Sequence, residues 1–171
     1  KALEKAGGNT IVINDPSDFS LVDKVVIPGV GSFKDAMQEL NDGDFIELLE
    51  NFDKPMLGIC LGMQILAKLG FEYGETRGLS LLDAEVKPIQ CDGKVPHMGF
   101  NKIQVVNSNI LLDGIENEEF YFMHSYEMIN YTNIIALTEY ESHSFVSAIH
   151  KDNLYGVQFH PEKSREAGIR L

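Results

Sequence analysis

The chain has 171 residues, of which 44% are hydrophobic and 23% charged, a composition typical of globular proteins rather than disordered or fibrous ones. The 14 Lys and Arg against 26 Asp and Glu give a net charge of −12. Such a field repels phosphate backbones and anionic membrane surfaces, so we expect no nucleic acid and no membrane among its partners. Two cysteines, Cys60 and Cys91, are too few for a disulfide-stapled secreted domain, and we expect a cytoplasmic location.

The first half of the chain alternates short apolar runs with helical patterns. Residues 1–8 indicate the end of a helix closed by glycine, so we expect the sequence to lack the native first strand. We also expect it to lack the native C-terminal end. Further strands are expected at residues 10–13, 24–27 and 56–59, and helices at residues 33–52 and 61–69. Because the apolar residues in these strands are continuous rather than alternating, they predict a parallel sheet covered by helices on both faces.

The second half is richer in β-structure. Strand patterns separated by turn residues occupy residues 85–90, 102–106, 120–129, 134–140, 144–150 and 154–159. No linker or repeat divides the chain. We therefore predict an α/β fold in one domain, residues 1–171, with a mostly parallel central sheet flanked by helices and a β-rich, partly antiparallel extension.

A candidate nucleophile lies between a predicted strand and a predicted helix. Residues 58–62, Gly-Ile-Cys-Leu-Gly, have the form Gly-x-nucleophile-x-Gly. A sharp turn at this point places Cys60 at the C-terminal edge of the sheet and at a helix N-terminus. The helix dipole and the free N–H groups then favour the thiolate, so we expect a thiol that is nucleophilic near neutral pH. The alternative is a small buried hydrophobic residue, which is what most free cysteines are.

A candidate base stands in the segment Gln-Phe-His-Pro-Glu, residues 158–162. The spacing of two places His160 and Glu162 on the same side of an extended segment, which Pro161 keeps stiff, so the carboxylate can hold the imidazole tautomer. Both Cys60 and His160 fall at the C-terminal ends of predicted strands, where open α/β sheets place their chemistry. Taken alone, His160 is a structural histidine, whereas together with Cys60 it indicates catalysis.

These segments resemble the class I, or triad, glutamine amidotransferases, and within them the glutaminase subunits of imidazole glycerol phosphate synthases. The similarity runs from end to end and is carried by five segments, residues 28–33, 58–64, 95–101, 121–126 and 158–164. The resemblance implies a flavodoxin-like α/β fold. It also implies that Cys60 attacks the side-chain amide of L-glutamine, that His160 transfers the proton to the leaving ammonia, and that Glu162 orients His160. A glutamyl thioester forms and is then hydrolysed.

Two backbone donors are expected to stabilise the oxyanion of this reaction. The Leu61 N–H directly follows the nucleophile, and the Val30 peptide is the second candidate. Gly29 and Gly31 let that peptide approach the substrate closely and also rotate, so we hypothesise that a partner switches the oxyanion site. An ordinary glycine turn is the alternative.

The resemblance further implies residues that bind the substrate. Gln64 resembles the family's anchor for the α-amino and carboxylate groups of glutamine, as do Ser125 and Tyr126. The alternatives are a surface glutamine and a half-buried strand. No pair of His or Cys residues has convincing metal-ligand spacing, so we expect no metal and no other cofactor.

The family also implies a partner, a (β/α)8-barrel cyclase subunit that receives ammonia through an internal passage. Lys163 resembles the family's interface lysine, with a solvated cation as an equal alternative. Met98 and Phe100, if exposed, fit an interface better than solvent. Phe100 stands where the family more usually has Trp, and this departure bears on the identity of the partner.

Three other functions stay open at this point. The first is a paralogous glutaminase that supplies ammonia for surface-polysaccharide sugars. The second is a catalytically silent docking subunit, against which the complete set Cys60, His160 and Glu162 argues. The third is a cysteine hydrolase of peptides or γ-glutamyl compounds, against which Gln64 argues. Cys91 has no partner motif and is expected to be an incidental thiol.

Overall fold

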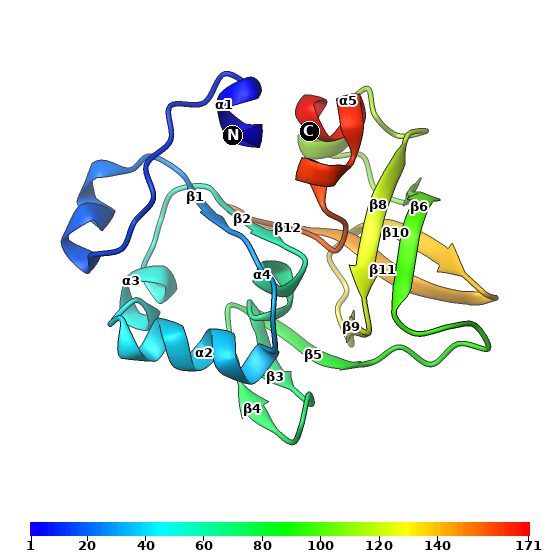
Figure 1. Cartoon of the computed structure of the whole chain (residues 1–171), viewed down its shortest axis with the longest axis horizontal. Helices are drawn as coiled ribbons and strands as arrows, with labels where there is room; N and C mark the ends of the chain where they lie inside the picture. The colour runs from blue at the N-terminus through cyan, green and yellow to red at the C-terminus, as the bar shows by residue number, and fades with distance from the viewer.

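The computed structural model describes residues 1–171 and contains a central six-stranded sheet beside two smaller ones (Figure 1). The central sheet has the order β1-β2-β12-β11-β10-β7, the second has the order β4-β3-β5-β9, and β6 pairs with β8. The strands are β1 (Val25–Ile27), β2 (Met56–Ile59), β3 (Ala67–Gly70), β4 (Thr76–Arg77), β5 (Leu82–Pro88), β6 (His97–Lys102), β7 (Gln104–Val105), β8 (Glu119–His124), β9 (Tyr126–Ile129), β10 (Ile134–Tyr140), β11 (His143–Lys151) and β12 (Leu154–Val157). The α-helices are α1 (Ala2–Lys5), α2 (Phe33–Asp42), α3 (Ile46–Glu50), α4 (Leu61–Gln64) and α5 (Arg165–Arg170), and the 3-10 helices are η1 (Pro16–Leu21), η2 (Ile110–Leu112) and η3 (Pro161–Lys163).

The parallel part of the central sheet positions the candidate site. Strands β1, β2 and β12 run parallel, with β2 in the middle. Ile59, the last residue of β2, pairs with Val157, the last residue of β12. The chain therefore leaves both strands at the same edge of the sheet, first at Cys60 and then at Gln158. This is the edge at which parallel α/β sheets place their chemistry.

The remaining strands of the central sheet are antiparallel. Strands β10 and β11 form a hairpin whose connection is Glu141 and Ser142, with φ of 47° and 62°. Two residues with positive φ form the turn whose twist suits a tight hairpin. The predicted α/β fold with a β-rich, partly antiparallel extension is confirmed. The central sheet, predicted to be mostly parallel, is mixed instead, since its parallel pairings are confined to β1, β2 and β12.

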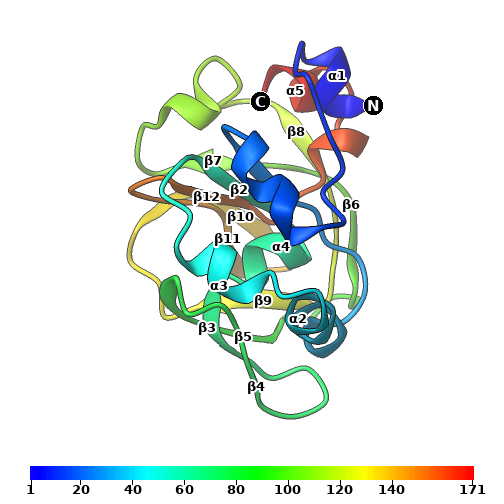
Figure 2. The ribbon, with the colours of Figure 1, turned by 90° about the vertical axis from the view of Figure 1, so that its left-hand side faces the viewer.

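Two hydrophobic clusters cover the two faces of the central sheet. The cluster of 19 buried residues lies under helices α2, α3 and α4, and the cluster of 12 lies under strand β8 and helix α5. Adjacent residues of β11, Ala148 and Ile149, enter different clusters because successive side chains of a strand point to opposite faces. Helix α1 packs against α5, so the two ends of the chain lie side by side (Figure 2). None of the helices is long and apolar enough to cross a membrane.

The helix predicted at residues 33–52 is two helices in the structure. Helix α2 ends at Asp42 with Gly43 as its C-cap, and Asp44 then adopts a φ of 59°. A left-handed residue interrupts the helical hydrogen bonds, and α3 begins only at Ile46. The prediction of one continuous helix was wrong because the apolar spacing continues across the break.

The helix predicted at residues 61–69 was wrong beyond its first turn. Helix α4 ends at Gln64, and strand β3 starts three residues later. The carbonyls of Ile65 and Leu66 accept from the N–H groups of Leu79 and Leu82, at 2.8 and 3.0 Å. A longer helix would need these carbonyls for its own bonds, so pairing with a distant segment replaces the local choice.

The strand predicted at residues 10–13 is also absent. These residues form no sheet pairing, and the first three of them lie exposed, with Val12 exposed to 82%. An apolar run gains little from the strand conformation where no surface covers it. Elsewhere boundaries shift: the run at residues 102–106 is shared between β6 and β7, and the run at 120–129 is divided at Ser125 into β8 and β9.

Candidate active site

The candidate nucleophile occupies a strained turn between β2 and α4. Cys60 has a φ of 52° and a ψ of −110°, a conformation that L residues rarely adopt. The Cys60 carbonyl accepts from the Gln64 N–H at 3.1 Å, so the helix starts directly at the turn. A Cβ at Gly62 would collide with the Ile27 carbonyl oxygen of β1, which explains why a glycine follows the nucleophile by two residues. The close approach of α4 to β1 holds this turn, called the elbow below, against the sheet.

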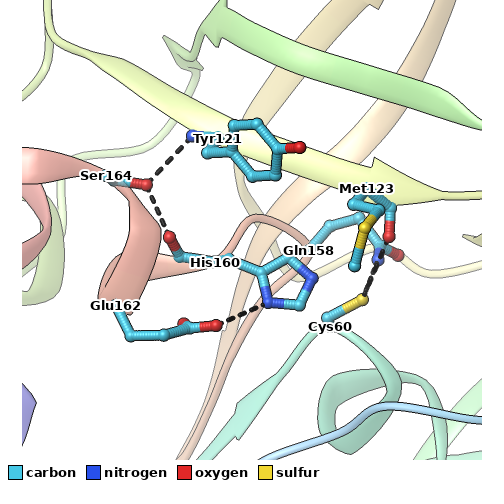
Figure 3. A network of polar contacts seen from close by, with 7 residues as sticks. All are labelled: Cys60, Tyr121, Met123, Gln158, His160, Glu162 and Ser164. Carbon is cyan, nitrogen blue, oxygen red and sulfur yellow. Dashed lines mark hydrogen bonds and ion pairs between the residues drawn. The ribbon is translucent and has the colours of Figure 1, made fainter.

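The imidazole of His160 is fixed by the carboxylate of Glu162. Nδ1 of His160 donates to Oε1 of Glu162 at 2.8 Å, because a carboxylate can only accept (Figure 3). Nε2 of the neutral ring is then an acceptor, and it is buried without any hydrogen-bond partner. The prediction that these two residues pair is confirmed, but the extended segment predicted for Pro161 is wrong: Pro161–Lys163 forms the 3-10 helix η3, which begins directly after His160.

Ser164 fixes the backbone on which His160 sits. Its hydroxyl donates to the His160 carbonyl at 2.6 Å and accepts from the Tyr121 N–H at 2.9 Å (Figure 3). The His160 N–H donates in turn to the Tyr121 carbonyl at 2.8 Å. Strand β8 and Ser164, which follows η3, thus fix the backbone of His160.

Cys60 and His160 line one cleft of about 400 Å³. Nine residues singled out from the sequence meet there: Gly29, Val30, Gly31, Cys60, Leu61, Gln64, Ser125, Tyr126 and His160. The same cleft is also lined by five residues to which the sequence pattern gave no role: Glu72, Tyr73, Pro96, Met123 and His124. Six separate segments of the chain therefore enclose a space next to a thiol and an imidazole.

The thiol of Cys60 is protonated at neutral pH, contrary to the expected thiolate. Burial raises its pKa to about 11, and the negative charge of Glu162 acts in the same direction. A hydrogen bond from the Leu61 N–H, the contact with Gln158 and the charge of Lys163 lower the pKa by less. The N-terminus of the four-residue helix α4 therefore lowers the pKa of Cys60 by less than desolvation raises it, since this residue is only 7% exposed.

Two buried side-chain amides connect the thiol to the backbone of strand β9. Nε2 of Gln64 donates to the Tyr126 carbonyl and to Oε1 of Gln158, both at 2.9 Å. Nε2 of Gln158 lies 3.5 Å from the Cys60 sulfur, and the thiol donates a hydrogen bond to the Met123 carbonyl at 3.8 Å (Figure 3). The Gln64 N–H groups are thus used inside the protein, and its role as a substrate anchor stays a prediction that depends on its remaining oxygen.

The residues expected to donate to the oxyanion both line the cleft, and the loop before Val30 packs against Leu61, since a Cβ at Gly29 would collide with it. Leu61 follows the nucleophile and is 5% exposed, and Val30 stands in the loop between β1 and α2. Gly31 has a φ of 107°, a conformation closed to most residues, so the loop does need glycine there. The Val30 side chain is 81% exposed, which leaves room for the loop to change shape.

The residues predicted to face a partner lie outside the cleft. Met98 is 58% exposed and Phe100 is 38% exposed, both on strand β6. The Lys163 ammonium lies over the Tyr121 ring at 5.7 Å, and the Arg165 guanidinium lies over the Phe100 ring at 4.2 Å. This apolar and basic surface adjoins Pro96, which lines the cleft. No group of three His, Cys, Asp or Glu side chains lies close enough together to hold a metal ion.

Comparisons with known proteins agree with this geometry. The profile of the family "Glutamine amidotransferase class-I" matches residues 3–169. The chain belongs to the class I glutamine amidotransferases. Within this family it is 39% identical to "Imidazole glycerol phosphate synthase subunit HisH 1" of Campylobacter jejuni, over 100% of this chain and 89% of that protein. It is 44% identical to "Imidazole glycerol phosphate synthase subunit HisH" of Vibrio cholerae, over 99% and 87%.

Solved structures support the amidotransferase fold. A crystal structure described as a glutamine amidotransferase superposes with a TM-score of 0.77 over 98% of this chain and 86% of that one, at 15% identity. The crystal structure of a putative GMP synthase protein from Thermoplasma acidophilum gives a TM-score of 0.74 over 99% and 80%, at 23% identity. The chain is thus a glutamine amidotransferase, related over its full length to the HisH subunits.

The residues that sequence reasoning missed in this amidotransferase stand next to residues it used. Gln158 begins the segment that contains His160, and His124 precedes Ser125. Glu72, whose carboxylate accepts from the Phe33 N–H at 2.7 Å, has no motif of its own. A polar residue two positions before the base was the one available signal, since Gln158 and His160 both follow the end of β12.

Proposed function

We propose that this amidotransferase is the glutaminase subunit of an imidazole glycerol phosphate synthase and hydrolyses L-glutamine to glutamate and ammonia in histidine biosynthesis. One observation carries the chemistry: Cys60, at a strained turn, shares a cleft with His160, whose Nδ1–H is held by Glu162. The relatives named HisH, which match over nearly the whole chain, support the choice of pathway. The two cysteines are free thiols, which supports a reducing, cytoplasmic location.

Attack on glutamine requires removal of a proton from Cys60. Because burial keeps the thiol protonated, His160 takes this proton at Nε2 as the sulfur bonds to the amide carbon of glutamine. Glu162 stabilises the imidazolium that results. The imidazolium then protonates the departing nitrogen, so that ammonia leaves and a glutamyl thioester remains on Cys60.

Water completes the cycle at the same three residues. His160 takes a proton from water as the water oxygen attacks the thioester carbon. The C–S bond then breaks, the imidazolium returns the proton to the Cys60 sulfur, and glutamate is released. Both attacks place negative charge on the carbonyl oxygen. The Leu61 N–H and the Val30 peptide are our candidates for the donors to this oxygen, and such a donor is worth about 3 kcal/mol in other acyl-transfer enzymes. Gly29 and Gly31 allow the backbone to approach the substrate, and Ser125 and Tyr126, which line the cleft, complete the proposed binding site.

The partner in this proposal is a (β/α)8-barrel cyclase subunit that uses the ammonia. The exposed apolar residues Met98 and Phe100, with Lys163 close by, lie beside the mouth of the cleft and form the proposed contact surface. A partner that covers the mouth keeps ammonia from water. Docking there also reaches the loop of Val30, so structures with and without the cyclase are expected to differ at the Val30 peptide.

The experiment measures glutamate release from L-glutamine by the purified protein, alone and with the barrel cyclase and its nucleotide substrate. Stimulation by that pair, abolished in Cys60→Ala and kept in Cys91→Ser, supports the proposal. Release that ignores the cyclase keeps the glutaminase chemistry but contradicts the pathway. Release in no condition contradicts the enzymatic function and favours a silent docking subunit. Competition by small peptides would favour a peptide hydrolase instead.

A further inference from the structure

Two buried histidines that catalysis does not use face each other on strands β6 and β8. His97 is 3% exposed and His124 is 6% exposed, and they are partners in the pairing of the two strands. Nδ1 of His97 lies 3.2 Å from Nε2 of His124. Two imidazoles at this distance share one proton between them, so each ring must be in a defined tautomer.

The Tyr126 carbonyl decides which tautomers these are. Nδ1 of His124 lies 2.9 Å from the Tyr126 carbonyl oxygen, which can only accept, so this nitrogen carries the proton. Nε2 of the neutral His124 ring is then an acceptor, and the Nδ1–H of His97 donates to it. Burial lowers the pKa of both histidines to about 4, so both rings are neutral at pH 7. One tautomer of the pair therefore satisfies every contact.

The same carbonyl oxygen connects this pair to the nucleophile. Tyr126 accepts from Nδ1 of His124 and also from Nε2 of Gln64, each at 2.9 Å. Gln64 donates to Gln158 at 2.9 Å, and the Gln158 amide reaches the Cys60 sulfur at 3.5 Å. A carbonyl with two donors is fixed in direction, and each amide in the series has only one orientation that satisfies its neighbours.

We propose that His97 and His124 are positioning residues of the glutaminase: their single tautomer holds the Tyr126 carbonyl, which orients the Cys60 thiol through the two amides. This inference rests on the proposed function. Neither histidine of the pair forms a hydrogen bond with the Cys60 thiol or with the His160 imidazole, so the pair acts through its neighbours. Its neutrality also serves the base, because a charge on His124 would repel the imidazolium that forms at His160.

A packing role is the competing explanation, since aromatic rings surround the pair. His97 stacks on Tyr140 at 4.1 Å and on Phe122 at 5.0 Å between ring centroids, and His124 meets Phe145 at 4.8 Å. If packing is the whole role, a phenylalanine serves as well as a histidine. If positioning is the role, an N–H group at the place of Nδ1 is required, and the amide of an asparagine supplies one.

The experiment compares His124→Phe with His124→Asn and includes His97→Phe. Misplacing the thiol is expected to lower kcat for glutamine on the order of tenfold to a hundredfold in His124→Phe, with KM within about twofold. His124→Asn, which keeps the donor and loses the ring, is expected to recover most of the kcat. The rate at which iodoacetamide alkylates Cys60 is expected to change strongly in His124→Phe and much less in His124→Asn. Thermal unfolding identifies any variant that is not folded.

Nitrogen NMR of the imidazoles in the wild-type protein gives a readout that does not depend on activity. The proposal requires the proton on Nδ1 in both His97 and His124. A proton on Nε2 of His124, or equal kcat in folded His124→Phe and His124→Asn, overturns it. Should the wild type release no glutamate at all, the proposed function fails, while the tautomers and the Cys60 alkylation rates still decide the positioning of the thiol.

Discussion

Nδ1 of His160 donates to a carboxylate oxygen of Glu162 at 2.8 Å, while Nε2 of the same ring is buried without a partner. An orphaned acceptor in a protein interior is costly, and so it is informative where it persists. Here the orphan faces a cleft that also holds the Cys60 thiol. Nε2 of the ring is therefore able to accept a proton, and the Cys60 thiol in the same cleft is the group that must lose one.

The carboxylate of Glu162 is expected to contribute mainly by its charge. In Glu162→Gln the amide oxygen still accepts from Nδ1 of His160, but the imidazolium loses its counter-charge, and kcat should fall about tenfold to a hundredfold. Glu162→Ala loses orientation as well and should fall further. Glutamate release at saturating glutamine measures both. Glu166→Gln, an exposed change on the neighbouring helix, is the control, and an equal loss there would contradict the assignment.

The raised pKa of Cys60 predicts an unusual pH dependence of alkylation. A thiol whose pKa rises from 9.0 to about 11 yields little thiolate at pH 7, so the rate should keep increasing to pH 11. Glu162→Gln removes a repelling charge and should move the profile to lower pH, whereas Lys163→Met should move it to higher pH. Iodoacetamide labelling in a Cys91→Ser background isolates the site. A plateau reached below pH 9 would refute the prediction.

The residues of this site differ in how far the sequence could predict them. Local sterics determine the turn at Cys60, and the contact between His160 and Glu162 joins residues only two positions apart. A short segment is therefore enough to predict both. The contact between Gln64 and Gln158 spans 94 residues and depends on two strands meeting, which no spacing reveals. The protonated thiol is a result of burial, a property of the folded protein, and the dipole argument alone gave the opposite direction.

Secondary structure shows the same division. The strand at residues 134–140 was predicted with its true boundaries because its apolar pattern and its turn agree. The helix predicted at residues 61–69 failed after Gln64, since the carbonyls that follow bond to residues 79–82 instead of to the next turn. Local preference decides an element only where no distant segment competes for its hydrogen bonds.

Ser164 is expected to stabilise the fold and to position the base. In Ser164→Ala the His160 carbonyl and the Tyr121 N–H each lose a buried partner, which should cost roughly 1–3 kcal/mol in the free energy of unfolding. His160 then gains freedom, and kcat should fall while KM for glutamine stays similar. Urea unfolding and glutamate release test the two effects. Ser20→Ala, at an exposed hydroxyl, should change neither.

Gly62 is expected to be the least replaceable glycine of the elbow. Its missing side chain lets α4 lie directly on the Ile27 carbonyl of β1, and backbone cannot move aside as a flexible side chain can. Gly62→Ala should therefore destabilise the protein by roughly 2–3 kcal/mol and displace Cys60 from the cleft. Gly74→Ala is the matched control: with a φ of 113° it strains the backbone, but its Cβ would meet no atom within 4 Å, so the loss should be about 1 kcal/mol. Urea unfolding compares the two. Equal losses would mean that the close approach of helix and strand does not hold the elbow.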